Sequence, residues 1–304
     1  MSQVAFPEIR IGDPVRYESL SVFPLFAGGE SPVEYMLSDE GIGSGSVTVE
    51  EVSEGGSVPD LLVENKGDVR VLFLEGEQLI GAKQNRILNT SVLIAAKSKT
   101  KIPVSCVEAG RWSYKSRHFG SGGTHSSHEL HRLLKMSVSA SMRESGSHMS
   151  DQGKVWAEVA RQQKSLGARS ATGAMSDTFE QYKERVAGFQ DKVKYVDGAT
   201  GVAVAIGKTV VSVEMFDKPA TCQKVWNRLL SGFVLDALEA KTDEAQANAA
   251  EVQAMLTTTN GMTWEKAEAV GEGEEYRAES GADVHASALT FKESPVHLSV
   301  VMAG

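Results

Sequence analysis

The sequence predicts an α+β fold, in which a largely antiparallel β-sheet sandwich or roll forms the core and a helical section with an αα-hairpin is inserted. Three observations predict it: short β-rich segments fill the first third, helical apolar stripes fill the middle, and strand-like segments return at the end. Strands on both sides of a helical middle favour one composite domain over residues 1–304. Its expected parts are a β-rich part (10–118), a helical insert (126–195), and a β-hairpin, buried helix and closing strands (200–304).

The first third is expected to form strands because its segments are rich in Val, Ile, Leu and Phe and are separated by Gly, Ser, Asp and Asn. These segments are YESLSVFPLF, VEYMLS, SVTVEEV, VRVLFL, EQLIGA, TSVLIAA and KIPVSCVE. FGSGGTHSS, residues 119–127, is the sharpest break in composition and predicts a loop.

In the helical insert, Ser126 and Glu129 fit a capping box in front of HELHRLLKMSVSASM. Two further apolar stripes, over residues 155–166 and 179–193, flank a loop at 167–175 and predict an αα-hairpin. The hairpin either packs on the rest of the chain or serves as a homo-oligomerisation arm.

In the last third, DGATGVAVAIGKTVVSVEMF predicts a β-hairpin with Gly207-Lys208 as its turn. CQKVWNRLLSGFVLDALEA is apolar around most of its circumference and predicts a buried helix. A helix over 243–256 and the strands TWEKAEAV, VHASALTF and VHLSVVM complete the expected fold.

Composition excludes several classes of protein. The chain is 41% hydrophobic and 23% charged, as in ordinary soluble proteins. No apolar run approaches the roughly 20 residues of a membrane span. Cys106 and Cys222 stand far apart behind a start without a basic, apolar leader, so we expect a cytoplasmic protein. The net charge of -9 argues against nucleic-acid binding.

One segment is basic: residues 68–118 carry 9 Lys and Arg against 4 Asp and Glu. It contains GEQLIGAKQNRILNTS, in which a strand-like run turns abruptly polar. With Glu75-Gly76 as a two-residue turn, Phe73 lies opposite Gln78, and both faces of the second strand become polar at one level. The strand then runs either into a wet cleft or to its own end.

The side chains of this polar run suit an anionic, hydroxyl-bearing ligand. Lys83 and Arg86 offer donors for phosphate or carboxylate, and Gln84, Asn85 and Asn89 offer donors and acceptors for hydroxyls. The alternative is that the cations pair with nearby carboxylates and the amides bond strand ends. Either way the segment predicts a polar cluster.

A second polar run, IPVSCVEAGRW, ends the next strand. Cys106 and Glu108 share one face of it. Glu108 is a candidate general base or a partner for Lys83 or Arg86, and Cys106 is a candidate nucleophile or a small buried hydrophobe. Lys83, Arg86 and Glu108 should converge around a cleft. The catalytic candidates are Glu108 and Cys106, and the ligand-binding candidates are Glu77, Lys83, Gln84, Asn85, Arg86, Asn89, Arg111 and Trp112.

Four histidines, at 118, 125, 128 and 131, fall within fourteen residues. On a helix, His128 and His131 point away from the apolar stripe, and no zinc motif accompanies them. We therefore expect a solvated cluster and no metal. No cofactor is indicated.

LEGEQLIGAKQNRILNTSVLI and IPVSCVEAGRW, with SDQGKVW and MFDKPATCQKVWNRLLSGFVLDAL, resemble a bacterial family associated with ADP-ribosylglycohydrolases and a rhodanese-phosphatase superfamily. The resemblance covers most of the chain and implies a link to ADP-ribose or NAD-related metabolism. It supplies no catalytic assignment. Matching polar positions are Glu75, Glu77, Lys83, Gln84, Asn85, Arg86, Asn89, Ser105, Cys106, Glu108, Arg111 and Trp112.

Two functions remain open. The chain either binds or processes a small anionic ligand, such as a phosphorylated ribose, ADP-ribose or an NAD-related nucleotide, or it is a non-catalytic scaffold with an internal polar network.

Overall fold

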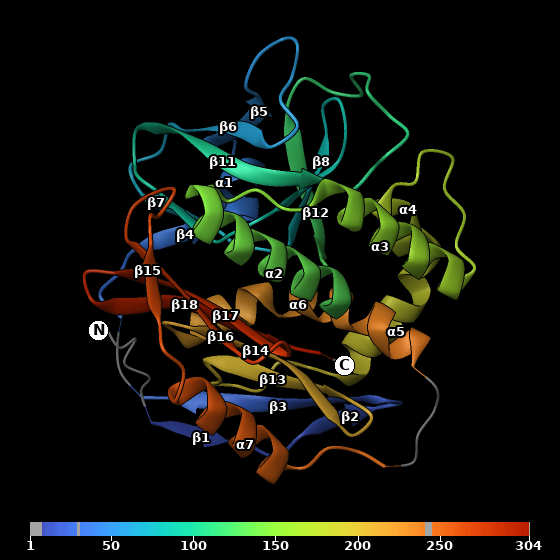
Figure 1. Ribbon diagram of the computed structural model, residues 1–304, viewed down its shortest axis with the longest axis vertical. Coiled ribbons are helices and arrows are strands. Elements are labelled where there is room, and N and C mark those ends of the chain that lie inside the picture. The colour runs from blue at the N-terminus through green and yellow to red at the C-terminus, as the bar shows by residue number, and fades with distance from the viewer. Residues whose placement is uncertain (1–7, 29–30, 241–244, 304) are drawn as a thin grey trace.

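The computed structural model describes residues 8–28, 31–240 and 245–303. Over these residues the chain forms two β parts with helices between and beside them; Figure 1 shows the smaller sheets above and the larger sheet below. The predicted α+β class is confirmed. The pairs between the described strands are antiparallel except for β4 (Tyr35–Leu37) with β7 (Arg70–Phe73).

The larger sheet joins the two ends of the described chain. Its nine described strands are β1 (Ile9–Ile11), β2 (Val15–Tyr17), β3 (Leu20–Ala27), β13 (Gly201–Ile206), β14 (Thr209–Phe216), β15 (Glu265–Ala267), β16 (Glu274–Ser280), β17 (Val284–Phe291) and β18 (Ser294–Met302). Strand β3 pairs with β13 along its length. The hairpin of β13 and β14 turns at Gly207-Lys208, as predicted, since Ile206 pairs with Thr209.

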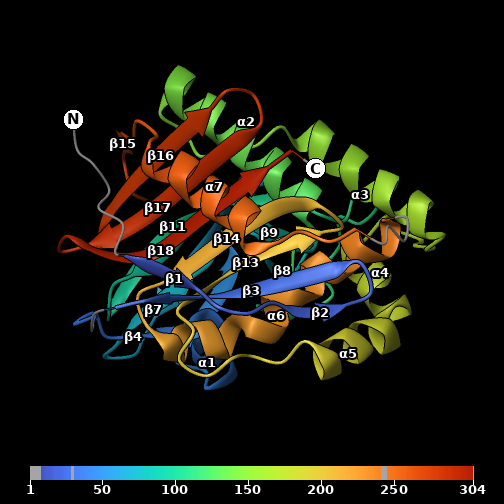
Figure 2. The same ribbon diagram turned by 90° about the horizontal axis from the view of Figure 1, so that it is seen from below.

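Two helices cover opposite faces of this sheet. Helix α6 (Pro219–Glu239) is the predicted buried helix and packs Val225, Leu229 and Phe233 on one face, where leucines of the smaller sheets also meet it. Helix α7 (Ala249–Asn260) packs on the other face, which Figure 2 views from below. The first two residues of the helix predicted at 243–256 lie outside the described residues.

The smaller sheets enclose a separate apolar core. One contains β4, β7 and β10 (Val92–Ile94). The other contains β5 (Val47–Glu51), β6 (Asp60–Asn65), β8 (Glu77–Gly81), β9 (Arg86–Leu88), β11 (Ser98–Cys106) and β12 (Phe119–His125). The short helix α1 (Ser38–Gly43) lies against them.

The hairpin predicted around Glu75-Gly76 is wrong. Strand β7 pairs with β10 and β4, whereas β8 pairs with β9 and β12, so Phe73 does not face Gln78. Gly76, with φ of 77°, turns the chain from one sheet into the other, and a Cβ there would lie 2.4 Å from His125 Cε1. The turn therefore requires glycine.

Six of the described strands were missed: β1, β2, β6, β9, β12 and β16. The loop predicted at 119–127 is largely β12, whose pairing with β8 overcomes the weak strand propensity of its glycines. Strand β16 pairs with β15 and β17.

The helical section comprises α2 (His128–Ser145), α3 (Gln152–Leu166), α4 (Met175–Gln181) and α5 (Lys183–Lys192). The second arm of the predicted hairpin is two helices, broken at Tyr182. Ser127, not Ser126, is the N-cap of α2, and it makes no side-chain cap bond. Among the helices that the structure describes, none has the length and apolar character that crossing a bilayer requires.

Candidate functional site

Most of the predicted site residues meet where β8 and β11 end and β9 begins. We call Gln84, Asn85, Arg86, Cys106, Glu108 and Arg111 the Glu108 cluster. The chain reaches it through Gly81 and Ala82, which have φ of 121° and 37°. A Cβ on Gly81 would lie 3.0 Å from the His118 carbonyl oxygen, so the protein's own backbone approaches this glycine closely.

Glu108 is the centre of this cluster. Its carboxylate accepts hydrogen bonds from Arg111 Nε (2.8 Å) and Nη2 (2.7 Å), from the backbone N–H of Asn85 (3.0 Å) and from Thr172 (2.9 Å). Burial alone would raise the pKa of Glu108, but the bonds from Arg111, Asn85 and Thr172 lower it. Glu108 is therefore a fixed carboxylate that positions the chain.

Arg86, Gln84 and Cys106 form the buried side of the cluster. Arg86 Nη1 donates to Gln84 Oε1 (2.9 Å), and Cys106 Sγ donates to the same oxygen (3.0 Å). Burial raises the pKa of the Cys106 thiol. Arg86 is 0% exposed, and its Nε and Nη2 have no hydrogen-bond partner among the described residues; Glu51 lies 4.0 Å away. The thiol is thus a buried donor.

Lys83 reaches a neighbouring loop. Its Nζ donates to the carbonyl oxygens of Glu54 (2.5 Å) and Gly55 (2.8 Å) and lies 5.3 Å from the ring centroid of Trp112. Trp112 is 47% exposed, so it does not belong to the core. Lys83 and Arg86 both lie beside the Trp112 ring, whereas Glu108 bonds Arg111, Asn85 and Thr172 and not these two cations. None of the three lines the cleft described below.

Two further candidates, Asn89 and Glu77, also lie outside the cluster. Asn89 donates to the His148 carbonyl oxygen (2.8 Å) and accepts from Ser105 (2.6 Å). Glu77 is fully buried, bonded to Ser38 and to the Leu74 N–H, and burial raises its pKa.

A cleft of about 820 Å³ opens beside the cluster. One wall is a face of β8 and β12, and the opposite wall is formed by α4 and α5. Asn85 connects the Glu108 cluster to the cleft. It lines the cleft, donates to Ser176 (3.1 Å) and accepts from Arg111 (3.3 Å). Lys115 and Lys183 lie at different walls. This cleft is the part of the site that solvent reaches.

The prediction of a solvated histidine cluster is wrong for three of the four residues. His125, His128 and His131 are 2–3% exposed, and only His118 lies near the surface. Helix α2 packs on α3 and α6 and also on β17 and β18, so the face opposite its apolar stripe is covered as well. Burial, the largest cause, lowers the pKa of both His125 and His128 to about 4.

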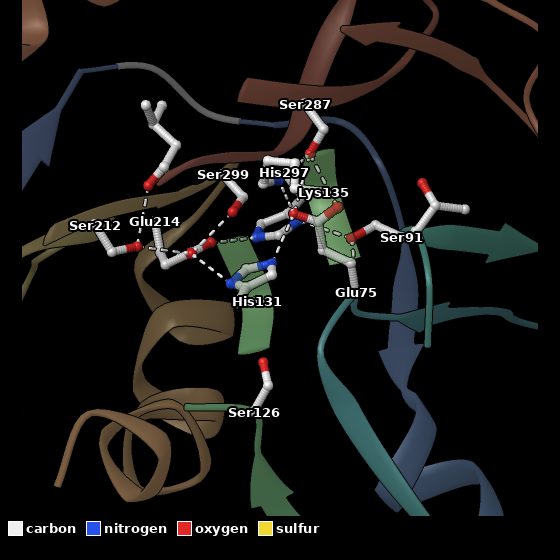
Figure 3. A network of polar contacts seen from close by, with 12 residues as sticks. Glu75, Ser91, Ser126, His131, Lys135, Ser212, Glu214, Ser287, His297 and Ser299 are labelled. Carbon is white, nitrogen blue, oxygen red and sulfur yellow. Dashed lines mark hydrogen bonds and ion pairs between the residues drawn. The ribbon is translucent and has the colours of Figure 1, made fainter. Parts of the chain in front are cut away.

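His131 belongs to a second polar centre, which the sequence reasoning missed and Figure 3 shows. We call it the buried network; its ionisable members are Glu75, His131, Lys135, Glu214 and His297. Four serines bond to them: Ser91, Ser212, Ser287 and Ser299. Its members come from the turn before β8, from α2 and from β14, β17 and β18, so it links the two β parts.

The buried network is closed. Glu75 bonds Lys135 and accepts from His131 (3.0 Å) and Ser287 (3.0 Å), and Glu214 lies 3.1 Å from His297. Burial would raise the pKa of Glu75, but Lys135 and His131 hold it well below its usual range. Burial lowers the pKa of Lys135. Among the described residues, each of these polar side chains has a partner.

The signal that could have located this network is a run of charged or polar residues at positions that also look like core. Lys135 and Glu214 each stand within an apolar segment. A buried charge requires a partner, which a single sequence does not name.

Among the described residues, no group of three or more His, Cys, Asp or Glu is arranged to hold a metal ion. A family model for the ARG and Rhodanese-Phosphatase-superfamily-associated Protein domain, ARPP-1, matches residues 8–301. No curated protein and no solved structure matches the chain.

Proposed function

The chain belongs to the ARPP-1 family, and from this premise we propose that its cleft binds a small anionic, hydroxyl-bearing ligand. A phosphorylated ribose, ADP-ribose and an NAD-related nucleotide have the required chemistry. The family description names an association with ARG. We take ARG to be ADP-ribosylglycohydrolase, the enzyme that the sequence resemblance also implies. The proposal concerns binding, and it assigns no reaction.

The observation that carries the proposal is the cleft itself and the groups lining it. Lys115 lines it and forms no ion pair within the described part of the chain, so its ammonium group is free for an anion. Lys183 lines the opposite side and pairs with the exposed Glu180. Ser116 and Ser176 add hydroxyl groups. A cleft with one free cation on its wall suits a ligand with one anionic end.

The Glu108 cluster is proposed to shape this cleft. It holds Asn85 at the cleft wall through the Asn85 N–H and Oδ1. Lys83 is engaged by two carbonyl oxygens, so we assign the anion to Lys115 and Lys183. Glu108 and Cys106 remain candidates for catalysis on sequence grounds; a lowered carboxyl pKa and a raised thiol pKa favour structural roles for both.

The test is a titration of the whole chain with ribose 5-phosphate, ADP-ribose and NAD, followed by thermal unfolding and calorimetry. A ligand at 100 times its Kd should stabilise the protein by about 2.7 kcal/mol. Lys115→Ala should weaken binding about tenfold, and Lys154→Ala, on an exposed helix surface, is the matched control. If none of the three ligands shifts unfolding or releases heat, the proposal is wrong.

A second function, that of a non-catalytic scaffold, is favoured by a different observation. The Glu108 cluster and the buried network bond mainly to the protein itself, as an internal framework would. This function predicts no response to the three ligands. The scaffold function includes the predicted homo-oligomerisation through α3–α5. Sedimentation of the intact chain and of a Trp156→Glu variant tests it, because Trp156 is 37% exposed on α3.

A further inference from the structure

We propose that the floor of the cleft, formed by Ile80 and Gly120, is the subsite for the planar ring of a nucleotide. This inference rests on the proposed function and narrows its ligand. A ligand with a base would be preferred over a sugar phosphate without one. The argument depends on one glycine, one exposed apolar side chain and one unpaired amide.

Gly120 has no structural need to be glycine. Gly122 is required because a Cβ there would lie 2.9 Å from the Gln78 carbonyl oxygen, and Gly123 has φ of 65°. Gly120 has a negative φ, and a Cβ there would meet nothing within 4 Å. Because glycine weakens a strand, its presence here is explained by the open space that it leaves over the cleft floor.

Ile80 supplies the apolar contact. It lies directly opposite Gly120 in the register of β8 and β12, so the two share a face, and that face lines the cleft. Ile80 is 39% exposed, although its neighbour Leu79 is 0% exposed. An exposed β-branched side chain beside a bare stretch of backbone forms a flat apolar surface that fits the face of a ring.

Gln78 supplies a polar group on the same face. It lines the cleft two residues before Ile80 and is 1% exposed. Its Oε1 accepts from Thr124 (2.7 Å), whereas its Nε2 has no hydrogen-bond partner among the described residues. A buried unpaired donor costs free energy unless a partner arrives. A ring nitrogen or carbonyl oxygen at the edge of a base would be such a partner.

The experiment compares AMP with ribose 5-phosphate, because AMP carries adenine where the sugar phosphate has a hydroxyl. The intact chain should bind AMP about tenfold more tightly or better. Gly120→Val should fold normally, because its side chain has open space, but should fill the floor and remove that preference. Gly43→Val is the matched control, at an exposed glycine that also has open space and negative φ.

A second variant tests the floor without filling it. Ile80→Thr keeps the branch at Cβ but replaces the ethyl group of isoleucine by a hydroxyl. AMP should therefore bind several-fold more weakly, while the affinity for ribose 5-phosphate should not change. Calorimetry gives each Kd, and circular dichroism checks each fold.

The outcomes separate this inference from the proposed function. If ribose 5-phosphate binds and AMP binds no better, or if Gly120→Val leaves the preference for AMP intact, the ring subsite is wrong and the anion cleft stands. If AMP, ribose 5-phosphate, ADP-ribose and NAD all fail to bind, both are wrong. Loss of the AMP preference in both cleft variants, with Gly43→Val unchanged, supports the subsite.

Discussion

The buried network and the Glu108 cluster are both rich in charged side chains, but they differ in access. The network is 0–7% exposed, and each of its described members has a hydrogen-bond or ion-pair partner within the protein. The cluster borders a cleft, contains a partly unpaired Arg86 and holds Asn85 at the cleft wall. The comparison teaches that burial of charge alone does not identify a binding site. Access and unused hydrogen-bonding capacity are the distinguishing properties.

The largest expected effect comes from opening the network at Lys135. Lys135→Met leaves Glu75 as an uncompensated buried charge and should lower the free energy of unfolding by about 3–5 kcal/mol. Urea denaturation measures it. Lys97→Met is the matched control, because its pair with Asp68 is exposed, and should change stability by under about 1 kcal/mol. Adding Glu75→Gln to Lys135→Met should restore part of the loss; no restoration would contradict a charge-based role.

The second largest expected effect is a pH dependence of the free energy of unfolding, caused by the buried His125 and His128. Because the pKa of His125 and His128 is about 4 in the folded state, the unfolded chain takes up their protons first as pH falls below about 6.5. Stability present above pH 6.5 is therefore lost toward pH 4, by about 3 kcal/mol per histidine.

Denaturation at several pH values checks this dependence. His128→Gln, which can keep the bond to the Met302 carbonyl oxygen, should flatten the slope between pH 6.5 and 4.5, and His118→Gln at the surface should not. Below pH 4.5 the carboxylates with lowered pKa, Glu75 and Glu214, add their own loss. An unchanged slope for His128→Gln would contradict the assignment.

A smaller effect is expected at the Glu108 cluster. Arg111→Lys loses the two-pronged contact with Glu108 and donors to the Gly81 and Ala82 carbonyl oxygens, at a cost of about 1–3 kcal/mol. Arg185→Lys, at an exposed pair with Glu18, should cost less than about 1 kcal/mol. If ligand affinity is unchanged in Arg111→Lys, the cluster does not shape the cleft.

The smallest effect is expected at Cys106. Cys106→Ser keeps a donor to Gln84 and the Glu108 carbonyl oxygen, so stability should change by about 1 kcal/mol or less and ligand binding should not change. The native thiol should react slowly with a disulfide reagent, because its pKa is raised and it is buried. Fast labelling, or loss of an activity found later, would return Cys106 to the catalytic candidates.

Local signals predicted the parts of the fold that local chemistry decides. The Gly207-Lys208 hairpin and the buried α6 follow from turn residues and apolar pattern. The pairing of Arg86 with Cys106 agrees with polar residues placed at the ends of successive strands, whereas Glu108 bonds Arg111 and not Lys83 or Arg86. These predictions used contacts between neighbours in sequence or in strand order.

Long-range partners decided the rest. The Glu75-Gly76 segment has the residues of a hairpin turn, yet α2 and β17 supply the partners that bury Glu75 there. The apolar stripe of α2 predicts one covered face, whereas α3, α6, β17 and β18 all pack on this helix and bury His128 and His131. The glycines of β12 favour a loop by local propensity. Their need for space follows from the pairing with β8, which the local sequence does not indicate.

The members of the buried network lie far apart in the sequence, so the ribosome synthesises them at different times. Glu75 emerges from the ribosome long before Glu214 and His297, which are 139 and 222 residues later in the sequence. Until β14 and β17 have been translated, Glu75 and Lys135 lack the Ser287 hydroxyl to which both bond, and His131 lacks Glu214. A nascent chain should therefore hold its first half in a loosely docked form, and final consolidation should follow completion of the last strands.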